Sequence, residues 1–116
     1  MRFGKLSFGS IKIGRITYEH DVVIDRGGVV ERKKRRSQRF RKKFGHTPLS
    51  MREKIPWKCK TLVIGTGNYE GLPVMKKIKR EAKRRNVKLV ILPTRRAIKV
   101  LSKNADRANA ILHVTC

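Results

Sequence analysis

The chain has 116 residues, which fits a single domain, and its 31 lysines and arginines against eight acidic residues give a formal charge of +23. No apolar run approaches the roughly 20 residues of a membrane helix, nothing at the start resembles a signal peptide, and Cys59 and Cys116 lack metal-ligand spacing. We therefore expect one cytoplasmic domain over residues 1–116, with reduced thiols and no metal or cofactor; a Cys59–Cys116 disulfide is the alternative.

The positive charge bears on partners rather than on the fold. A charge of +23 destabilises the compact state by self-repulsion, which screening or an anionic partner relieves. Nucleic acid, an acidic protein surface and anionic lipid are the candidate anions, and without a membrane segment we expect no membrane partner. The alternative is that the basic side chains only contact solvent, and that their number reflects an adaptation of composition across the whole proteome.

The first thirty residues predict short antiparallel strands that extend or flank the main sheet. Gly9 and Gly14 separate three of them as turns or bulges. Asp-Arg-Gly-Gly at 25–28 lies between two apolar runs and predicts a β-hairpin, because glycine supplies the positive φ of such a turn. The alternating apolar residues are Leu6 and Phe8, Ile11 and Ile13, and Ile16 and Tyr18.

Residues 32–56 are the most basic and least regular part of the chain. Nine lysines and arginines between positions 32 and 43 would repel one another in an isolated helix. We therefore predict an exposed, partly extended or mobile segment at 32–43. Thr47 and Pro48 then predict the start of a short helix that Pro56 ends.

The second half predicts a strand–helix–strand–helix–strand unit. Apolar runs at 61–65 and 88–92 suit strands buried on both faces, and a third strand is expected at 110–116. Pro73 fits the first turn of one helix, Asn86 its C-terminal cap, and Thr94 the N-cap of the next. The inner faces of the helices are expected to be Leu72, Met75, Ile78 and Ala82, and Ala97, Ile98, Leu101 and Ala105.

Connections of this length join parallel strands by right-handed crossovers. The fold class that we predict is therefore α/β, a three-layer domain with a mixed central sheet. Antiparallel strands form its N-terminal part, and the parallel strand–helix–strand–helix–strand unit forms its C-terminal part.

Two loops leave the carboxyl ends of the predicted parallel strands, at 65–71 and 93–96, where open α/β sheets bind ligands. Each leads into a helix N-terminus that favours an anion. The three glycines of the first loop miss the dinucleotide-binding spacing by one residue, so a tight turn that serves only packing is the alternative. The candidate anion or small-molecule site comprises Gly65, Thr66, Gly67, Asn68, Thr94, Arg95 and Arg96.

A second candidate site is a basic surface for nucleic acid. The stretch at 32–43 and the exposed side of the helix near 76–85 are typical of a surface that follows a phosphate backbone. Few aromatic side chains are left for base stacking, so we expect low sequence specificity and strong salt dependence. A solvated helix face is the alternative. The candidate residues are Lys33, Lys34, Arg35, Arg36, Arg39, Lys83 and Arg84.

No catalytic constellation emerges from the residues. His20, His46 and His113 share no catalytic or metal-binding spacing, and a lone histidine on a buried strand, such as His113, is more often a core residue with satisfied hydrogen bonds. Carboxylates such as Asp21 and Glu53 are scattered without a pair that the sequence places together. We expect no enzyme activity.

The chain also resembles a known family. Gly-Thr-Gly at 65–67, Pro-Thr-Arg-Arg-Ala at 93–97 and Ala-Ile-Leu-His-Val-Thr-Cys at 110–116 are similar to the adipogenesis-associated Mth domain family, which includes a mitochondrial complex I assembly factor. The early hairpin and Gly45 extend the resemblance over nearly the whole chain. The resemblance implies a three-layer α/β domain with no established activity, cofactor or catalytic residue, in which some members act by protein association. Residues 32–56 are far more basic than the family's pattern, which changes the surface that a partner would meet.

Three functions are therefore open. The first expectation is a non-catalytic protein-binding or assembly module. A nucleic-acid-associated basic protein of low sequence specificity, and an anion or small-molecule site at the strand-end loops, are the alternatives.

Overall fold

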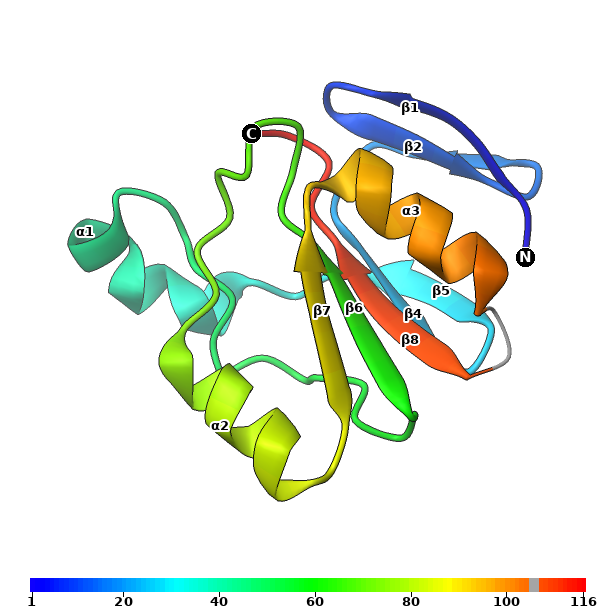
Figure 1. The fold of residues 1–116 in the computed structure, drawn as a ribbon. Coiled ribbons are helices and arrows are strands. Elements are labelled where there is room, and N and C mark those ends of the chain that lie inside the picture. The colour runs from blue at the N-terminus through cyan, green and yellow to red at the C-terminus, as the bar shows by residue number, and fades with distance from the viewer. Residues whose placement is uncertain (105–106) are drawn as a thin grey trace.

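The structure is a computed structural model that describes residues 1–104 and 107–116. In these ranges a five-stranded sheet with the order β5-β4-β8-β6-β7 forms the centre, and a three-stranded sheet β1-β2-β3 lies beside it (Figure 1). The strands are β1 (Phe3–Ser7), β2 (Ser10–Ile13), β3 (Ile16–Tyr18), β4 (Val22–Asp25), β5 (Gly28–Glu31), β6 (Thr61–Gly65), β7 (Lys88–Leu92) and β8 (Ala108–Leu112). The helices are the 3₁₀ helix η1 (Arg35–Phe40), α1 (Arg41–Phe44), α2 (Lys76–Arg84) and α3 (Thr94–Lys103), none of which is long and apolar enough to cross a membrane.

The N-terminal strands are antiparallel, as predicted. Turns at Gly9 (φ 87°) and Gly14 (φ 63°) join β1 to β2 and β2 to β3. These three strands form a sheet of their own, whose buried Ile11 and Ile13 pack in the same core as Leu101 of α3. Only the hairpin of β4 and β5 extends the central sheet.

The hairpin of β4 and β5 turns where the sequence predicted. Asp25 pairs with Gly28, and the two residues between them, Arg26 (φ 48°) and Gly27 (φ 84°), both have positive φ, as a type I′ turn requires. The first of these positions is an arginine rather than a glycine. Its backbone N–H donates to Asn109 Oδ1 of β8 at 2.8 Å, which helps to hold the turn in this conformation.

The central sheet is mixed because β6 pairs in parallel with both β7 and β8, whereas β8 pairs antiparallel with β4. Helices α2 and α3 lie on opposite faces of it (Figure 1). Successive residues of the central strands therefore enter different cores: Val63 faces α3, whereas Leu62 and Ile64 face α2. This arrangement confirms the predicted three-layer α/β fold.

The prediction for residues 32–43 was right about exposure and wrong about the backbone. Eight of the nine lysines and arginines are exposed, whereas Arg32 is buried at 4% exposure. Residues 35–44 form η1 and α1 rather than an extended segment. The charge of Arg32 is compensated by buried carboxylates, a contact that the local sequence does not reveal.

The predicted helix after Thr47 was also wrong. Leu49 forms an isolated parallel bridge with Val74, in which its N–H donates to Pro73 O at 2.8 Å and its carbonyl accepts from Met75 N at 3.0 Å. Leu49 is fully buried, so these long-range contacts replace the local helix that the proline pattern favours.

Element boundaries in the second half differ by a few residues. The last strand covers Ala108–Leu112 rather than 110–116, and α2 begins at Lys76, after extended residues that include Pro73. Asn86 has φ 57°, as expected after the C-terminus of a helix. Thr94 is the first residue of α3 and Pro93 takes the N-cap position, because the Thr94 hydroxyl bonds elsewhere. Ala105, expected on the inner face of α3, lies outside the described residues.

Candidate functional site

The strand-end loop after β6 wraps around the last residues of the chain. The backbone N–H of Asn68 donates to Thr115 O at 2.9 Å. The N–H groups of Tyr69 and Gly71 donate to Cys116 O at 2.7 and 2.9 Å. Amides that could have bound an external anion are thus already bonded to the chain's own backbone.

Two glycines of this loop allow close packing. A Cβ atom at Gly67, which has φ +100°, would lie 2.7 Å from Cys116 O and 2.8 Å from His113 Cδ2. A Cβ atom at Gly65 would lie 2.8 Å from Thr94 Oγ1. Both positions therefore require glycine for packing alone, whatever else the loop does.

Thr94 joins the two predicted loops. Its Oγ1 donates to His113 O at 2.6 Å and accepts from Gly67 N at 2.8 Å, and its N–H donates to Gly67 O at 3.1 Å. Arg95 and Arg96 are exposed, and among the described residues their guanidinium groups form no hydrogen bond or ion pair. Of the candidate anion site, the structure therefore leaves these two side chains available to a ligand. The half-buried side chain of Asn68, which forms no hydrogen bond among the described residues, is available as well.

Thr66 is also engaged within the fold. Its N–H and its Oγ1 both donate to Leu92 O, at 2.9 and 3.2 Å, and its carbonyl accepts from Leu72 N at 3.1 Å. These bonds join the end of β6 to the end of β7. The polar groups of Thr66 therefore stabilise the fold and are not free to bind a ligand.

A buried ionic cluster lies beside the C-terminal residues, and the sequence did not reveal it. Arg32 donates from Nε and Nη2 to the two oxygens of Glu53 at 2.7 and 2.8 Å, and from Nη1 to Asp21 Oδ2 at 2.8 Å. Its Nη2 also donates to Pro48 O at 3.1 Å. Ser37 Oγ donates to Glu53 Oε2 at 2.5 Å. Because each charge has partners, the cluster is fully satisfied although it is buried.

The same contacts shift two ionisation equilibria. Burial alone would raise the pKa of Asp21, but hydrogen bonds from His113 and Val114 and the charge of Arg32 outweigh it and lower that pKa from 3.8 to about 2. For Arg32, burial opposes the charged form, and the bonds to Glu53 and Asp21 outweigh it and raise its pKa. Both groups are therefore charged at neutral pH.

His113 connects the ionic cluster to the end of the chain. Its Nδ1 lies 2.8 Å from Asp21 Oδ2 and its Nε2 lies 3.1 Å from Thr115 Oγ1. This carboxylate–imidazole–hydroxyl order matches that of a hydrolytic triad. However, Asp21 also binds Arg32 and the Val114 N–H, so its charge is shared and the chain of bonds serves to hold residues 113–116 in place.

Other sites of possible chemistry are sparse in the part of the chain that the structure describes. There, no group of three or more His, Cys, Asp or Glu side chains could hold a metal ion. Cys59 and Cys116 are both free, so they form no disulfide with each other. Burial raises the pKa of the Cys59 thiol, which makes it a weaker nucleophile at neutral pH.

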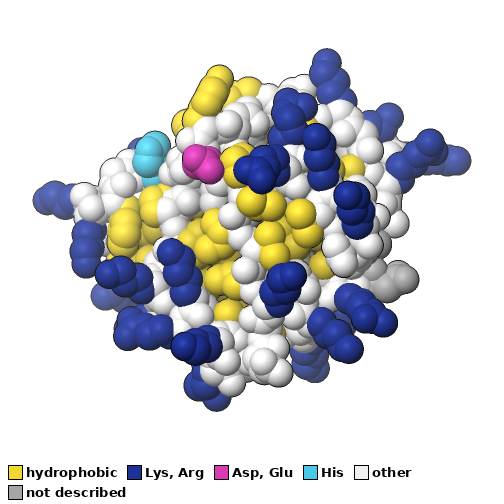
Figure 2. All heavy atoms as spheres, viewed as in Figure 1, with side chains coloured by type: hydrophobic (Ala, Val, Ile, Leu, Met, Phe, Trp, Pro, Cys, Tyr) yellow, Lys and Arg dark blue, Asp and Glu magenta, His cyan; other side chains and the backbone are white. Residues whose placement is uncertain are grey.

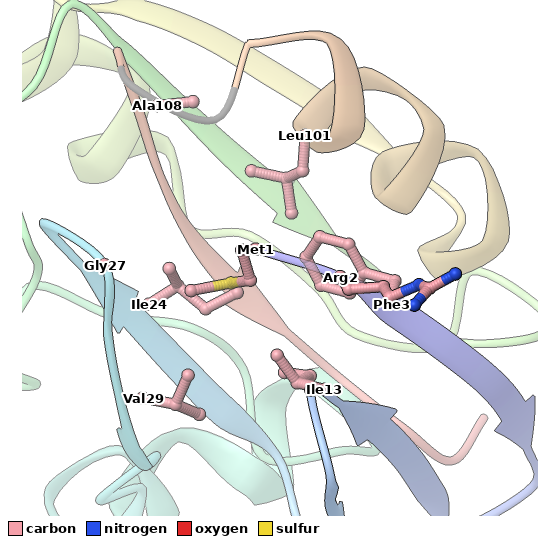
Figure 3. Close-up of a pocket in the computed structure, with 10 residues that line it drawn as sticks. Met1, Arg2, Phe3, Ile13, Ile24, Gly27, Val29, Leu101 and Ala108 are labelled. Atoms are coloured by element: carbon pink, nitrogen blue, oxygen red, sulfur yellow. The ribbon is translucent and has the colours of Figure 1, made fainter.

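An apolar hollow of about 370 Å³ lies between α3, the β4–β5 hairpin and the first strands (Figure 3). Among the described residues that line it, Arg2 is the only one with a charged side chain, and none contributes a carboxylate, imidazole, thiol or hydroxyl group. The hollow therefore offers apolar surface without the converging polar groups that orient a ligand. Its lining includes Met1, Phe3, Ile13, Ile24, Val29, Leu101 and Ala108.

The predicted nucleic-acid residues fall into separate groups. Arg35, Arg36 and Arg39 line one hollow together with Arg52, which sequence reasoning had not selected. Arg52 lies in a turn at residues 51–52 where the sequence predicted a helix, so nothing in the sequence placed it near η1. Lys33 is exposed and lies 3.7 Å from Glu31. Lys34, the residue before η1, is also exposed.

The two predicted residues on α2 lie elsewhere. Lys83 lines a hollow with Lys79, Lys88 and Leu89 at the start of β7. Arg84 is exposed and forms an ion pair with Glu81, which lowers the pKa of that carboxyl group. The seven predicted residues therefore do not form one continuous site.

A family model described as "Protein of unknown function (DUF498/DUF598)" matches residues 3–113. The chain belongs to this family. A search of curated proteins found no match to it. Membership of the DUF498/DUF598 family assigns no activity to the protein.

Solved structures share the whole fold of this DUF498/DUF598 member. The conserved hypothetical protein PH1505 from Pyrococcus horikoshii OT3 is 28% identical, with 100% of each chain covered and a TM-score of 0.83. A protein titled MT938 is 25% identical over 98% of this chain and 97% of its own, with a TM-score of 0.70. An outer membrane protein from Bartonella henselae shares the fold alone, at 12% identity, a TM-score of 0.65, and coverage of 98% and 94%.

Proposed function

We propose that this DUF498/DUF598 protein is a non-catalytic protein-association module, which receives an extended acidic segment of a partner protein at the free edge of β7. The observation that carries the proposal is the state of this strand. β7 is the last strand in the order β5-β4-β8-β6-β7, so one of its edges has no neighbour among the described residues. Four of its five residues are apolar and only half-buried.

An apolar edge strand is unusual unless something covers it. Proteins protect such edges with charged residues, prolines or bulges, because the unpaired backbone groups recruit other strands. In β7 only Lys88, its first residue, is charged, and the register with β6 is regular over all five residues. The edge is therefore suited to accept a further strand.

The surroundings of the edge favour an acidic partner. Figure 2 shows hydrophobic side chains gathered over β7, with lysine and arginine side chains around them. Lys79, Lys83 and Lys88 line a hollow with Leu89 at the start of the strand. A second copy of a chain with a charge of +23 would be repelled, whereas carboxylates would be attracted.

The association mode would be strand addition. Main-chain hydrogen bonds to the β7 edge provide affinity, and alternate side chains of the added strand meet the apolar centre or the basic rim. The resemblance to a family in which some members act by protein association supports the same function. The alternative of an anion site at the strand-end loops has less support, because the amides of those loops already donate hydrogen bonds within the fold.

A synthetic peptide tests this proposal directly. The probe is an eight-residue capped peptide of alternating glutamate and valine, titrated into ¹⁵N-labelled protein. We expect amide shifts concentrated in β7, and weaker binding of the Lys79→Gln/Lys83→Gln variant. Lys42→Gln/Lys43→Gln on α1 is the matched control with the same loss of charge, and its affinity should stay close to that of the wild type.

The control on the peptide side is N-methylation of its backbone, which keeps the charges and removes the donors. Equal binding of the methylated peptide, or shifts that avoid β7, would show that no strand is added there. A stable dimer paired through β7 in light scattering and cross-linking would equally overturn the proposal, since the edge would then be occupied by a second copy.

A further inference from the structure

Four arginines converge on one surface hollow of about 570 Å³. Arg35, Arg36 and Arg39 come from η1, and Arg52 comes from the turn that follows Leu49. All four side chains are exposed, and arginine is the residue that best matches phosphate oxygens through paired N–H donors. The hollow therefore concentrates the side chain that is suited to phosphate.

Buried hydrogen bonds on the inner side of the domain hold the two segments that carry these arginines. Ser37, on the inner side of η1, is fully buried, and its Oγ lies 2.6 Å from Ser50 Oγ and donates to Glu53 at 2.5 Å. The N–H of Arg52 donates to Ser50 Oγ at 3.2 Å. The arginines thus project from a backbone that buried hydrogen bonds hold in place, which reduces the entropy lost on binding.

None of the described residues that line the hollow carries a carboxylate to offset this charge. Glu53, the acidic residue beside Arg52 in the chain, points inward and is engaged by Arg32 and Ser37. Among the described residues, the lining of the hollow contains only arginine. Four like charges held together repel one another, and an anion from outside the chain relieves that repulsion.

We propose that this arginine hollow is a binding site for the phosphate backbone of a nucleic acid. Its cationic surface continues along the chain in both directions, with Lys33 and Lys34 before η1 and Arg41, Lys42 and Lys43 on α1, as a polymer of phosphates requires. A single small phosphate would need only the hollow itself. The site does not use β7, so it stands independently of the function proposed above.

The recognition is expected to be insensitive to base sequence. The aromatic rings nearby, Phe40 and Phe44, are half-buried, and each has a cation over it: Arg39 at 5.6 Å and Lys43 at 5.8 Å from the ring centroids. A cation therefore already occupies one face of each half-buried ring, which leaves little aromatic surface on which bases could stack. Phosphate contacts position a nucleic acid without reading its sequence.

Binding of a fluorescent 20-nucleotide oligouridylate, measured by anisotropy across a series of salt concentrations, tests the site. The variant is Arg35→Gln/Arg36→Gln/Arg39→Gln/Arg52→Gln. Loss of four phosphate contacts on a single strand should flatten the plot of log affinity against log salt by about 3, and weaken binding by about tenfold or more at moderate salt. A 20-mer of another sequence should behave in the same way.

The matched control removes four exposed charges from elsewhere: Lys5→Gln/Lys12→Gln/Arg15→Gln/Lys99→Gln, on β1, β2, the turn after β2 and α3. Its salt slope should change by less than about 1. Equal losses in both variants would mean diffuse attraction and overturn the site, as would negligible binding of the oligonucleotide by the wild type. Competition by inorganic tripolyphosphate as strong as that by RNA, at equal phosphate concentration, would assign the hollow to small phosphates instead.

Discussion

The Nδ1 atom of His113 lies 2.8 Å from the Oδ2 atom of Asp21, a residue 92 positions earlier in the chain. The other oxygen of the same carboxylate accepts from the Val114 N–H at 3.0 Å. Asp21 stands directly before β4 and His113 directly after β8, so this buried carboxylate joins the ends of two neighbouring strands. It also anchors the segment that fills the strand-end edge of the sheet.

Replacement of Asp21 should be costly for this reason. Asp21→Asn leaves His113 and Arg32 without the charge that both contact, and loss of one partner from a buried ion pair destabilises by about 3–5 kcal/mol. Urea unfolding measures the change. Glu31→Gln is the control, because the Glu31–Lys33 pair is exposed and 3.7 Å apart, and it should cost less than about 1 kcal/mol. Equal losses in both variants would contradict the structural role of Asp21.

Stability should fall in acid as Asp21 takes up a proton. Its pKa in the folded protein is about 2, below the ordinary value of 3.8, so the folded state favours the ionised form. The resulting stabilisation is fully present above about pH 4 and is lost as the pH falls toward 2, with a size of about 2 kcal/mol. Unfolding free energies measured across that range should show the loss in the wild type. Asp21→Asn should lack this component, and an unchanged acid slope in that variant would assign it to other groups.

Gly67→Ala should destabilise strongly because two costs add. The backbone has φ +100°, and the new Cβ would overlap the carbonyl group of Cys116. Gly9→Ala separates these costs, since Gly9 has φ +87° but nothing lies within 4 Å of an added Cβ. We expect a loss of about 1 kcal/mol at position 9, and of about 3 kcal/mol or more at position 67. Equal melting temperatures of the two variants would show that the contact with Cys116 is not tight.

Salt should stabilise this protein. With a formal charge of +23, the folded state repels itself, and the screening length shortens from about 30 Å at 0.01 M salt to about 8 Å at 0.15 M. Thermal unfolding should therefore shift to higher temperature over this range. The four-glutamine variant of the arginine hollow should be at least as stable as the wild type in low salt, since it removes like charges. A lower stability of that variant would show that the arginines support the fold.

Local patterns predicted most of the central architecture. Strands with apolar residues on both faces, such as β6, and glycines with positive φ at positions 9 and 14 follow from side-chain periodicity and backbone sterics. Buried apolar runs separated by helical spacing were enough to predict the three parallel strands and the helices between them. These signals lie within a few residues of the element that they specify.

The ionic cluster could not be predicted in this way. Arg32 lies in a run of exposed lysines and arginines, and nothing adjacent to it distinguishes the one that is buried. Its partners Asp21 and Glu53 are 11 and 21 positions away. The contacts at the candidate sites could not be predicted for the same reason, because they join residues that are far apart in the sequence. The arrangement of Gly67 with Cys116 depends on contacts across the whole second half, and the hollow shared by η1 and Arg52 depends on Ser37 and Ser50.

The pairing of β4 with β8 has a consequence for synthesis of the protein. β4 covers Val22–Asp25 and occupies the position between β5 and β8, yet its partner strand Ala108–Leu112 is synthesised only after all the residues between them. The β4–β5 hairpin can form early, but one of its edges stays unpaired until β8 has left the ribosome. During that interval the nascent chain exposes Val22, Val23 and Ile24. The time spent on this half-built sheet, rather than the stability of the finished one, should govern how well the protein is produced.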